Sequence, residues 1–261
     1  RRLVLICLVF VVAGCSPRAA LFLDPRDEPP AEVLPVFVGT TRALDPEEGF
    51  VSDRSPDIRF LRYDISVPPD REPGEVTHPE WAVEPEKDFL VRDGRGFGSA
   101  RAFRADLGRE LMARSRSERE VVIYVHGFNN NFAEGVLRLA QLSSDFDLPG
   151  VPVHYAWPSA ANPLGYVHDR DSVLFARDGL EALIDEVEAA GARRIIIVAH
   201  SLGSMLTMEV LRQMAIARPG SVSRRVDGVI LLSPDLDVDV FRRQAARIGR
   251  LPQPFGIFVS K

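Results

Sequence analysis

The chain has 261 residues, of which 46% are hydrophobic and 26% are charged, and its formal net charge is −5. These proportions are typical of a globular protein and exclude a disordered or fibrous one. The net negative charge gives no broad basic surface, so we do not expect a nucleic acid as a partner.

The N-terminus has the pattern of a bacterial export signal. Arg1 and Arg2 precede a short apolar run that ends in small residues before Cys15, an arrangement typical of a secretory signal. The run is shorter than the roughly 20 residues that a membrane-spanning helix needs. Residues 12–15, VAGC, resemble the lipobox of bacterial lipoproteins. The resemblance implies that residues 1–15 are a signal, that Cys15 becomes lipidated, and that the protein is anchored at the bacterial cell envelope. The alternative is a plain signal peptide or an uncleaved anchor in which Cys15 has no role.

Residues 16–34 are rich in proline and charge, and we predict that they form a tether. Strands are expected over 35–42 and 57–67, the second with partial alternation of apolar and polar residues. Residues 68–98 are again rich in proline, glycine and charge, which predicts a long irregular excursion. Its GRGFG segment, residues 94–98, predicts a flexible turn rather than a phosphate-binding loop, because no clear strand precedes it.

From residue 100 onward, predicted helices and strands alternate. The predicted helices cover 100–115, 131–146, 171–191, 203–217 and 237–249, and the predicted strands cover 118–128, 151–159, 193–201, 226–235 and 254–260. Strands that are nearly continuous apolar runs, separated by helices, indicate a mostly parallel sheet with helices on both faces. We therefore predict one α/β domain over 35–261, with additional strands at its N-terminal end.

The junction between the predicted strand at 193–201 and the next helix places Ser201 on a tight turn. Such a junction can lift a serine hydroxyl out of a sheet for nucleophilic attack. The helix directs its N-terminus at the site, which favours negative charge there, and the small Gly203 allows strand and helix to pack closely. Leu202 would donate one backbone N–H to an oxyanion hole. The alternative is that Ser201 is only a helix N-cap, a role that serine fills well.

Five segments of the chain together resemble the α/β-hydrolase superfamily, and in particular a bacterial branch of serine esterase-like proteins. They are VGTTR, VHGFNN, YAWPS, AHSLGS and LLSPDLD, and they span Val38 to Asp239. The resemblance implies an α/β-hydrolase fold and a serine nucleophile. These motifs are specific for the fold and the superfamily, and far less specific for the substrate.

The same resemblance implies roles for residues outside the serine turn. His126 and Gly127 stand where α/β-hydrolases take a second oxyanion N–H, and Phe128 is the donor position. We interpret His126 as a residue that orients this loop through its backbone, not as the catalytic base. Trp157 is expected to help wall the site, and a place in the hydrophobic core is the alternative.

The base of a serine hydrolase is usually a histidine, and in this superfamily it follows the serine and the acid in the chain. All histidines precede Ser201; they are His78, His126, His154, His168 and His200. His200 adjoins the nucleophile, but neighbouring side chains on such a turn point apart. We interpret His154 as sheet packing. His168 is expected on a loop that could reach the site, as a substitute base.

Asp235 and Asp237 follow the predicted strand at 226–235 and are the candidates for the acid. Helix capping is the alternative for Asp237 and the preferred interpretation of Asp239. The aspartate spacing is not that of a calcium loop, because valine and alanine occupy the positions of the required glycine and glutamate. The superfamily has a further strand and its histidine after this point. We therefore expect the chain to be a fragment, truncated before the last strand, whose histidine lies beyond Lys261.

The sequence thus predicts a serine hydrolase that cleaves carboxylic esters by an acyl-enzyme mechanism, with a small-molecule or lipid ester as substrate. It predicts attachment to the membrane through a lipid anchor and implies no metal ion or organic cofactor. One alternative is a non-catalytic envelope protein that uses the fold as a scaffold or binding module. Another is an acyltransferase that uses the same serine. No feature of the sequence indicates the oligomeric state.

Overall fold

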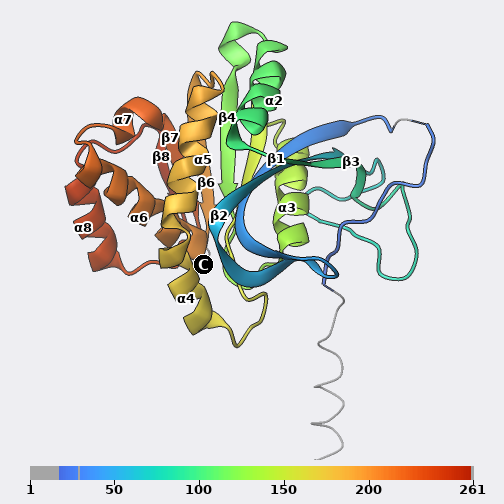
Figure 1. Ribbon diagram of the computed structural model, residues 1–261, viewed down its shortest axis with the longest axis horizontal. Coiled ribbons are helices and arrows are strands. Elements are labelled where there is room, and N and C mark those ends of the chain that lie inside the picture. The colour runs from blue at the N-terminus through green and yellow to red at the C-terminus, as the bar shows by residue number, and fades with distance from the viewer. Residues whose placement is uncertain (1–17, 29, 260–261) are drawn as a thin grey trace, which may run out of the picture.

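One sheet of eight strands forms the centre of the protein (Figure 1). The computed structural model describes residues 18–28 and 30–259. The strands are β1 Val33–Asp45, β2 Gly49–Ser66, β3 Leu90–Phe97, β4 Glu120–Val125, β5 Val151–Ala156, β6 Arg194–His200, β7 Gly228–Leu232 and β8 Phe255–Phe258. Their spatial order is β3-β2-β1-β5-β4-β6-β7-β8. The strands from β1 to β8 in this order pair in parallel, whereas β2 is antiparallel to both β1 and β3.

Helices pack on both faces of this sheet. They are α2 Ala100–Met112, α3 Phe132–Asp145, α4 Tyr166–Phe175, α5 Arg177–Ala189, α6 Leu202–Ala217, α7 Val222–Arg225 and α8 Val238–Ile248, with a 3-10 turn at Arg116–Glu118. Buried side chains of α2, α5 and α6 share one hydrophobic cluster with the sheet, and those of α3 pack in a second cluster. Figure 1 shows α3 on one side of the sheet and α5 and α6 on the other. The predicted fold class, a mostly parallel sheet with helices on both faces, is confirmed.

The central strands explain this two-sided packing. Every residue of β4 and of β5 is buried. Successive side chains of a strand point to opposite faces, so Val121 and Ile123 enter one cluster and Tyr124 enters the other. A strand covered on both faces needs a nearly continuous apolar sequence. Burying each such side chain stabilises the fold by about 1.5–3 kcal/mol.

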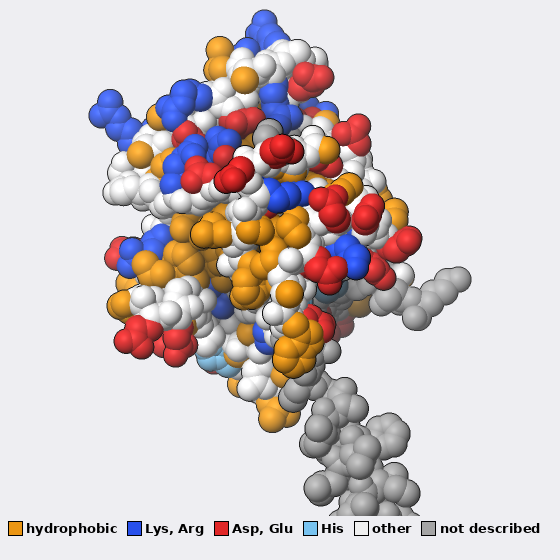
Figure 2. Space-filling view, turned by 90° about the vertical axis from the view of Figure 1, so that its right-hand side faces the viewer, with side chains coloured by type: hydrophobic (Ala, Val, Ile, Leu, Met, Phe, Trp, Pro, Cys, Tyr) orange, Lys and Arg blue, Asp and Glu red, His pale blue; other side chains and the backbone are white. Residues whose placement is uncertain are grey.

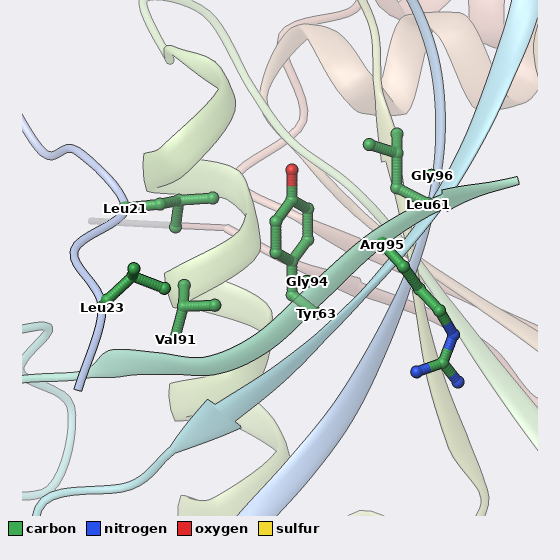
Figure 3. Close-up of a pocket in the computed structure, with 8 residues that line it drawn as sticks. All are labelled: Leu21, Leu23, Leu61, Tyr63, Val91, Gly94, Arg95 and Gly96. Atoms are coloured by element: carbon green, nitrogen blue, oxygen red, sulfur yellow. The ribbon is translucent and has the colours of Figure 1, made fainter. Parts of the chain in front are cut away.

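Residues 18–24, which lie within the predicted tether, pack on the N-terminal strands. Leu23 forms a parallel bridge with Val91 of β3. Leu21 and Leu23 point toward Tyr63 and Val91 at a cavity of about 330 Å³ (Figure 3). Figure 2 shows the right-hand side of the molecule, where hydrophobic side chains gather across the middle of the surface. This part of the predicted tether is therefore attached to the domain.

The prediction of a flexible turn at 94–98 was wrong, because Gly94 and Gly96 belong to β3. The irregular segment after β2 ends at Phe89, shortly before these glycines. Glycine has a low preference for strands, but pairing with β2 decides the conformation here. Gly94 lies against Tyr63, and a side chain at Gly94 would come within 3.0 Å of the Tyr63 ring.

The helix predicted over 171–191 is two helices, α4 and α5, which separate at Ala176. Ala176 is fully buried, and its carbonyl accepts a hydrogen bond of 2.6 Å from the Tyr155 hydroxyl of β5. This tertiary contact fixes the break, and no local sequence signal marks it. The first helix begins at Tyr166, so His168 lies on a helix and not on the expected loop.

The predicted signal over 1–15 and its lipidation site Cys15 lie outside the described residues. None of the helices in the described part of the chain is long and apolar enough to cross a membrane. Anchoring through Cys15 therefore stays a prediction.

Candidate active site

Ser201 lies on a sharp turn between β6 and α6. Its φ is 51° and its ψ is −124°, a conformation that non-glycine residues rarely adopt and that costs of order 1–3 kcal/mol. Backbone hydrogen bonds fix the turn. The Ser201 N–H donates to the Leu232 carbonyl of β7 (3.0 Å), and the Ser201 carbonyl accepts from the N–H groups of Ser204 (2.9 Å) and Asp235 (3.2 Å). The turn therefore presents the serine at the carboxyl end of a central strand, as a nucleophile requires.

The Ser201 side chain is half-buried and makes no capping hydrogen bond to α6. Serine at the start of a helix usually does form such a bond. The interpretation of Ser201 as a helix cap therefore has no support in its side-chain contacts. Among the described residues, its hydroxyl makes no hydrogen bond to α6.

Two glycines bring the loop after β4 against this turn. A Cβ on Gly127 would lie 2.8 Å from the Ser201 Cβ and 2.6 Å from the His200 Nδ1. A Cβ on Gly203 would lie 2.5 Å from the carbonyl oxygen of Val125. Real Cβ atoms do not approach other atoms so closely, so both positions need glycine. The structure thus brings Gly127 and Gly203 together around Ser201.

Two backbone N–H groups are available to form an oxyanion hole. Within the described residues, the N–H groups of Phe128 and Leu202 donate to no protein acceptor. Leu202 is the first residue of α6, so its N–H is one of the unpaired donors of a helix N-terminus, where the helix dipole favours negative charge. Phe128 directly follows the glycine that touches Ser201. This arrangement can stabilise negative charge that develops beside the Ser201 hydroxyl.

The His126 side chain packs with Trp157 at the start of the loop that follows β4. Its Nδ1 is 2.9 Å from the Gly127 carbonyl oxygen, and its Nε2 is 3.0 Å from the Trp157 carbonyl oxygen. The two rings stack with centroids 4.8 Å apart, and the Trp157 indole N–H donates to the His126 carbonyl (2.7 Å). Burial lowers the pKa of His126 well below its usual value, so the ring is neutral at pH 7. Both side chains are fully buried. Trp157 therefore belongs to the core and does not wall the site.

The two candidate acids have different surroundings. The Asp235 N–H donates to the Ser201 carbonyl, and its half-buried carboxylate accepts a hydrogen bond of 2.9 Å from the Tyr166 hydroxyl. Burial and the hydrogen bond to Asp235 raise the pKa of Tyr166. Asp237, in contrast, is exposed and caps α8, where its Oδ1 accepts from two N–H groups of the first turn. The capping expected of Asp239 is therefore done by Asp237, and Asp235 is the aspartate that hydrogen-bonds the Ser201 turn.

In the described part of the chain, no histidine ring hydrogen-bonds the Ser201 hydroxyl. His154 is fully buried in β5, and burial lowers its pKa to about 3. His200 packs against Gly127, and burial also lowers its pKa. His168 is on α4, with its Nδ1 3.4 Å from the Asp169 Oδ1. The described residues thus supply a serine hydroxyl and unpaired N–H groups beside it, but no histidine that hydrogen-bonds this hydroxyl.

Two fully buried charged residues near the site, Arg42 and Asp169, were not predicted from the sequence. Arg42 donates to main-chain carbonyls of the loops after β4 and β5, and burial lowers its pKa to about 10. Asp169 accepts hydrogen bonds from the same two loops. The sequence around Arg42 does not mark it as buried, because Gly39, Thr40 and Thr41 separate it from the apolar residues of β1 and arginine is rarely buried unless it is paired. No local signal marks Asp169.

The described residues around the Ser201 turn offer no set of metal ligands. No group of three or more His, Cys, Asp or Glu side chains is placed there to hold a metal ion. Four partly buried apolar side chains, from the segments that meet at the Ser201 turn, pack on the main core cluster; they are Phe128, Tyr166, Met205 and Leu236. The rings of Phe128 and Tyr166 meet edge to face at 5.4 Å. The arrangement can perform nucleophilic acyl transfer by a hydroxyl, with backbone N–H groups to stabilise charge.

Comparison with known proteins places this site within a described family. A family model described as "Alpha/beta hydrolase of unknown function (DUF900)" matches residues 99–261, more than half of the chain. The matched range contains the Ser201 turn and the loop after β4, and it excludes β1 to β3. No curated protein matches the chain.

Proposed function

Because the chain belongs to this family of alpha/beta hydrolases of unknown function, we propose that it is a serine hydrolase that cleaves carboxylic esters. The observation that carries the proposal is the strained, uncapped Ser201 beside two unpaired N–H groups. A serine with a purely structural role would gain about 1 kcal/mol by capping α6. Ser201 lacks that bond and keeps a strained backbone, and strain of this kind clusters at functional sites.

In the proposed reaction, the Ser201 Oγ attacks the ester carbonyl carbon while its proton passes to a general base. The carbonyl oxygen becomes an oxyanion, which accepts hydrogen bonds from the N–H groups of Phe128 and Leu202. Each such donor lowers the barrier by about 3 kcal/mol. The intermediate then expels the alcohol, which takes the proton from the base and leaves Ser201 acylated. A water molecule, activated by the same base, releases the carboxylic acid and restores the hydroxyl.

We assign Asp235 as the carboxylate that would orient a histidine as the general base. Asp235 supports this assignment because it is anchored through its own N–H to the Ser201 carbonyl. A carboxylate in such a place can fix the tautomer of a histidine and stabilise its protonated form. The described residues alone should react slowly, because removal of a triad member lowers the rate by several orders of magnitude.

The surroundings of Ser201 favour an ester with an apolar acyl group. The support for this proposal is that partly buried apolar side chains come from the segments that meet at the turn; they are Phe128, Tyr166, Met205 and Leu236. Lipid esters and small apolar esters both have this chemistry. The resemblance of residues 12–15 to a lipobox supports the further proposal that Cys15 anchors the enzyme at the bacterial envelope.

One observation favours a second candidate, a non-catalytic envelope protein that uses the fold as a scaffold. Within the described residues, no histidine contacts the Ser201 hydroxyl by a hydrogen bond. A scaffold needs no base and tolerates this arrangement. An acyltransferase is a variant of the main proposal, because it forms the same acyl-enzyme and differs only in the acceptor.

Labelling of the full-length gene product with a fluorophosphonate probe tests the proposal. We expect one phosphonylated residue, Ser201, identified by mass spectrometry, and no labelling of Ser201→Ala. Ser99→Ala is the matched control, because Ser99 caps α2 through its side chain and its loss should leave the labelling unchanged. A folded wild-type protein that stays unlabelled would refute the hydrolase and favour the scaffold. Diversion of the acyl group to an added alcohol would identify an acyltransferase.

A further inference from the structure

Two loops border the site, and both contain strained backbone. The oxyanion loop, residues 126–131, follows β4, and the β5 loop, residues 157–161, follows β5. Asn129 in the first loop has a φ of 56°, and Ala161 in the second has a φ of 51°. Alanine rarely adopts this conformation, which persists only where the surroundings fix it firmly. Other parts of the molecule must therefore hold these loops in place.

Arg42 spans both loops with one guanidinium group. Its Nη2 donates to the Asn130 carbonyl of the oxyanion loop (2.7 Å), and its Nη1 donates to the Ser159 carbonyl of the β5 loop (3.0 Å). The side chain is 1% exposed, so water does not compete for these bonds. The planar fork of arginine fixes the two acceptors relative to each other.

Asp169 of α4 holds the same loops from the other side. Its Oδ2 accepts from the Ser159 hydroxyl (2.6 Å) and the Asn129 N–H (3.3 Å), and its Oδ1 accepts from the Ala160 N–H (2.6 Å). The Ser159 Oγ in turn accepts from the Asn130 N–H (3.2 Å). The carboxylate thus fixes the backbone beside both strained residues.

Packing of the core alone does not require two buried charges. Burying a charge is unfavourable unless it is paired and hydrogen-bonded, and apolar side chains of similar volume often hold a fold as well. Arg42 and Asp169 have opposite charges and meet through Ser159, which gives its carbonyl to one and its hydroxyl to the other. Their bonds go to backbone groups of the two loops, to the Ser159 hydroxyl and, from Arg42, to the Val51 carbonyl of β2. The network therefore sets loop geometry.

We propose that Arg42 and Asp169 are positioning residues that hold the Phe128 N–H where it binds the oxyanion. The connection runs through Asn130, whose side-chain amide donates to the Phe128 carbonyl (2.8 Å) while its main chain contacts both Arg42 and Ser159. This inference rests on the proposed serine hydrolase activity. A displacement of about 1 Å in such a donor lowers a rate by roughly 100-fold.

The test compares Asp169→Asn and Arg42→Lys with the wild type in the full-length protein. Asparagine places an NH₂ group against an N–H or O–H donor, and lysine keeps the charge but loses the fork. We expect each variant to lower the rate of fluorophosphonate labelling at Ser201 by at least about tenfold. With a p-nitrophenyl ester as substrate, kcat should fall while KM changes little. The double variant should lose scarcely more than either single variant, because the two residues act as a unit.

Asp106→Asn is the control for general loss of stability. Asp106 is a buried carboxylate of α2 that pairs with arginines away from the two loops, so this variant should melt lower and label normally. If Asp169→Asn fails to fold, Ser159→Ala tests the same network, because it removes the hydroxyl that joins Asp169 to the Asn130 N–H. A labelled wild type with folded variants that label at the same rate would overturn the positioning role alone. An unlabelled wild type would instead refute the hydrolase on which this role depends.

Discussion

Replacing Gly127 with alanine should slow acylation of Ser201 while the protein stays folded. The new Cβ would lie 2.6 Å from the His200 Nδ1 and 2.8 Å from the Ser201 Cβ, where ordinary contacts begin at 3.4 Å. The differences from 3.4 Å are 0.8 Å and 0.6 Å, so the oxyanion loop must retreat by nearly that much. A displacement close to 1 Å lowers the rate by up to about 100-fold, which corresponds to about 2.7 kcal/mol of barrier.

The same substitution should destabilise the fold by about 1–3 kcal/mol, as overpacking does. For a chain of this size the melting temperature should then fall by about 2–12 °C. The assay is the second-order rate of fluorophosphonate labelling, measured beside thermal unfolding. Gly98→Ala is the matched control, because a Cβ there would meet nothing within 4 Å. If Gly127→Ala labels and melts like the wild type, the oxyanion loop does not touch Ser201 and the site as described is wrong.

Three further expectations concern the acid and the buried histidines. Asp235→Asn should lower the labelling rate by about tenfold or more, whereas Asp237→Ala should lose only a helix cap, about 1 kcal/mol of stability, and label normally. The free energy of unfolding should fall as the pH drops from about 6.5 toward 4, because His126 and His154 are buried in the neutral form and gain protons on unfolding. Each histidine should contribute a loss of up to about 1.4 kcal/mol per pH unit. The pKa of His154 is about 3 in the folded state. His154→Phe should reduce that slope by a third to a half in urea unfolding at pH 7, 6 and 5, and an unchanged slope would contradict the assignment.

The elements that the sequence predicts well are those whose signals are local. β4 and β6 are apolar runs of the right length, and the junction at Ser201 has its turn and helix within a few residues. The errors have a different origin. Gly94 belongs to a strand because β2 pairs with it, and the helix over 171–191 breaks because the Tyr155 hydroxyl of β5 binds the carbonyl at the break. Both depend on residues that lie far away in the chain.

In the candidate site, too, the residues in local motifs could be predicted from the sequence, and those from distant elements could not. Ser201, Leu202 and Phe128 lie in short motifs, so the sequence alone places the nucleophile and both N–H donors in one hypothesis. Arg42 and Asp169 come from β1 and α4, and nothing near either residue shows that they meet the same two loops. Arginine and aspartate side chains are mostly exposed in proteins, so their residue types predict a surface position for both. Only the folded structure reveals that these two charges are buried beside the oxyanion loop.

If the chain is the proposed serine hydrolase, charge stabilisation and proton transfer depend on separate sets of residues. The turn at Ser201 and the oxyanion loop are held by glycine packing, backbone hydrogen bonds and two buried charges, and none of these contacts involves a general base. The oxyanion hole should therefore be complete whether or not a histidine is present. Enzymes that lose a triad member keep a residual acceleration of about 10³–10⁴ from the hole and from binding. Changes at Gly127, Arg42 or Asp169 should lower that residual rate, whereas a change at Asp235 should act only when the base is in place.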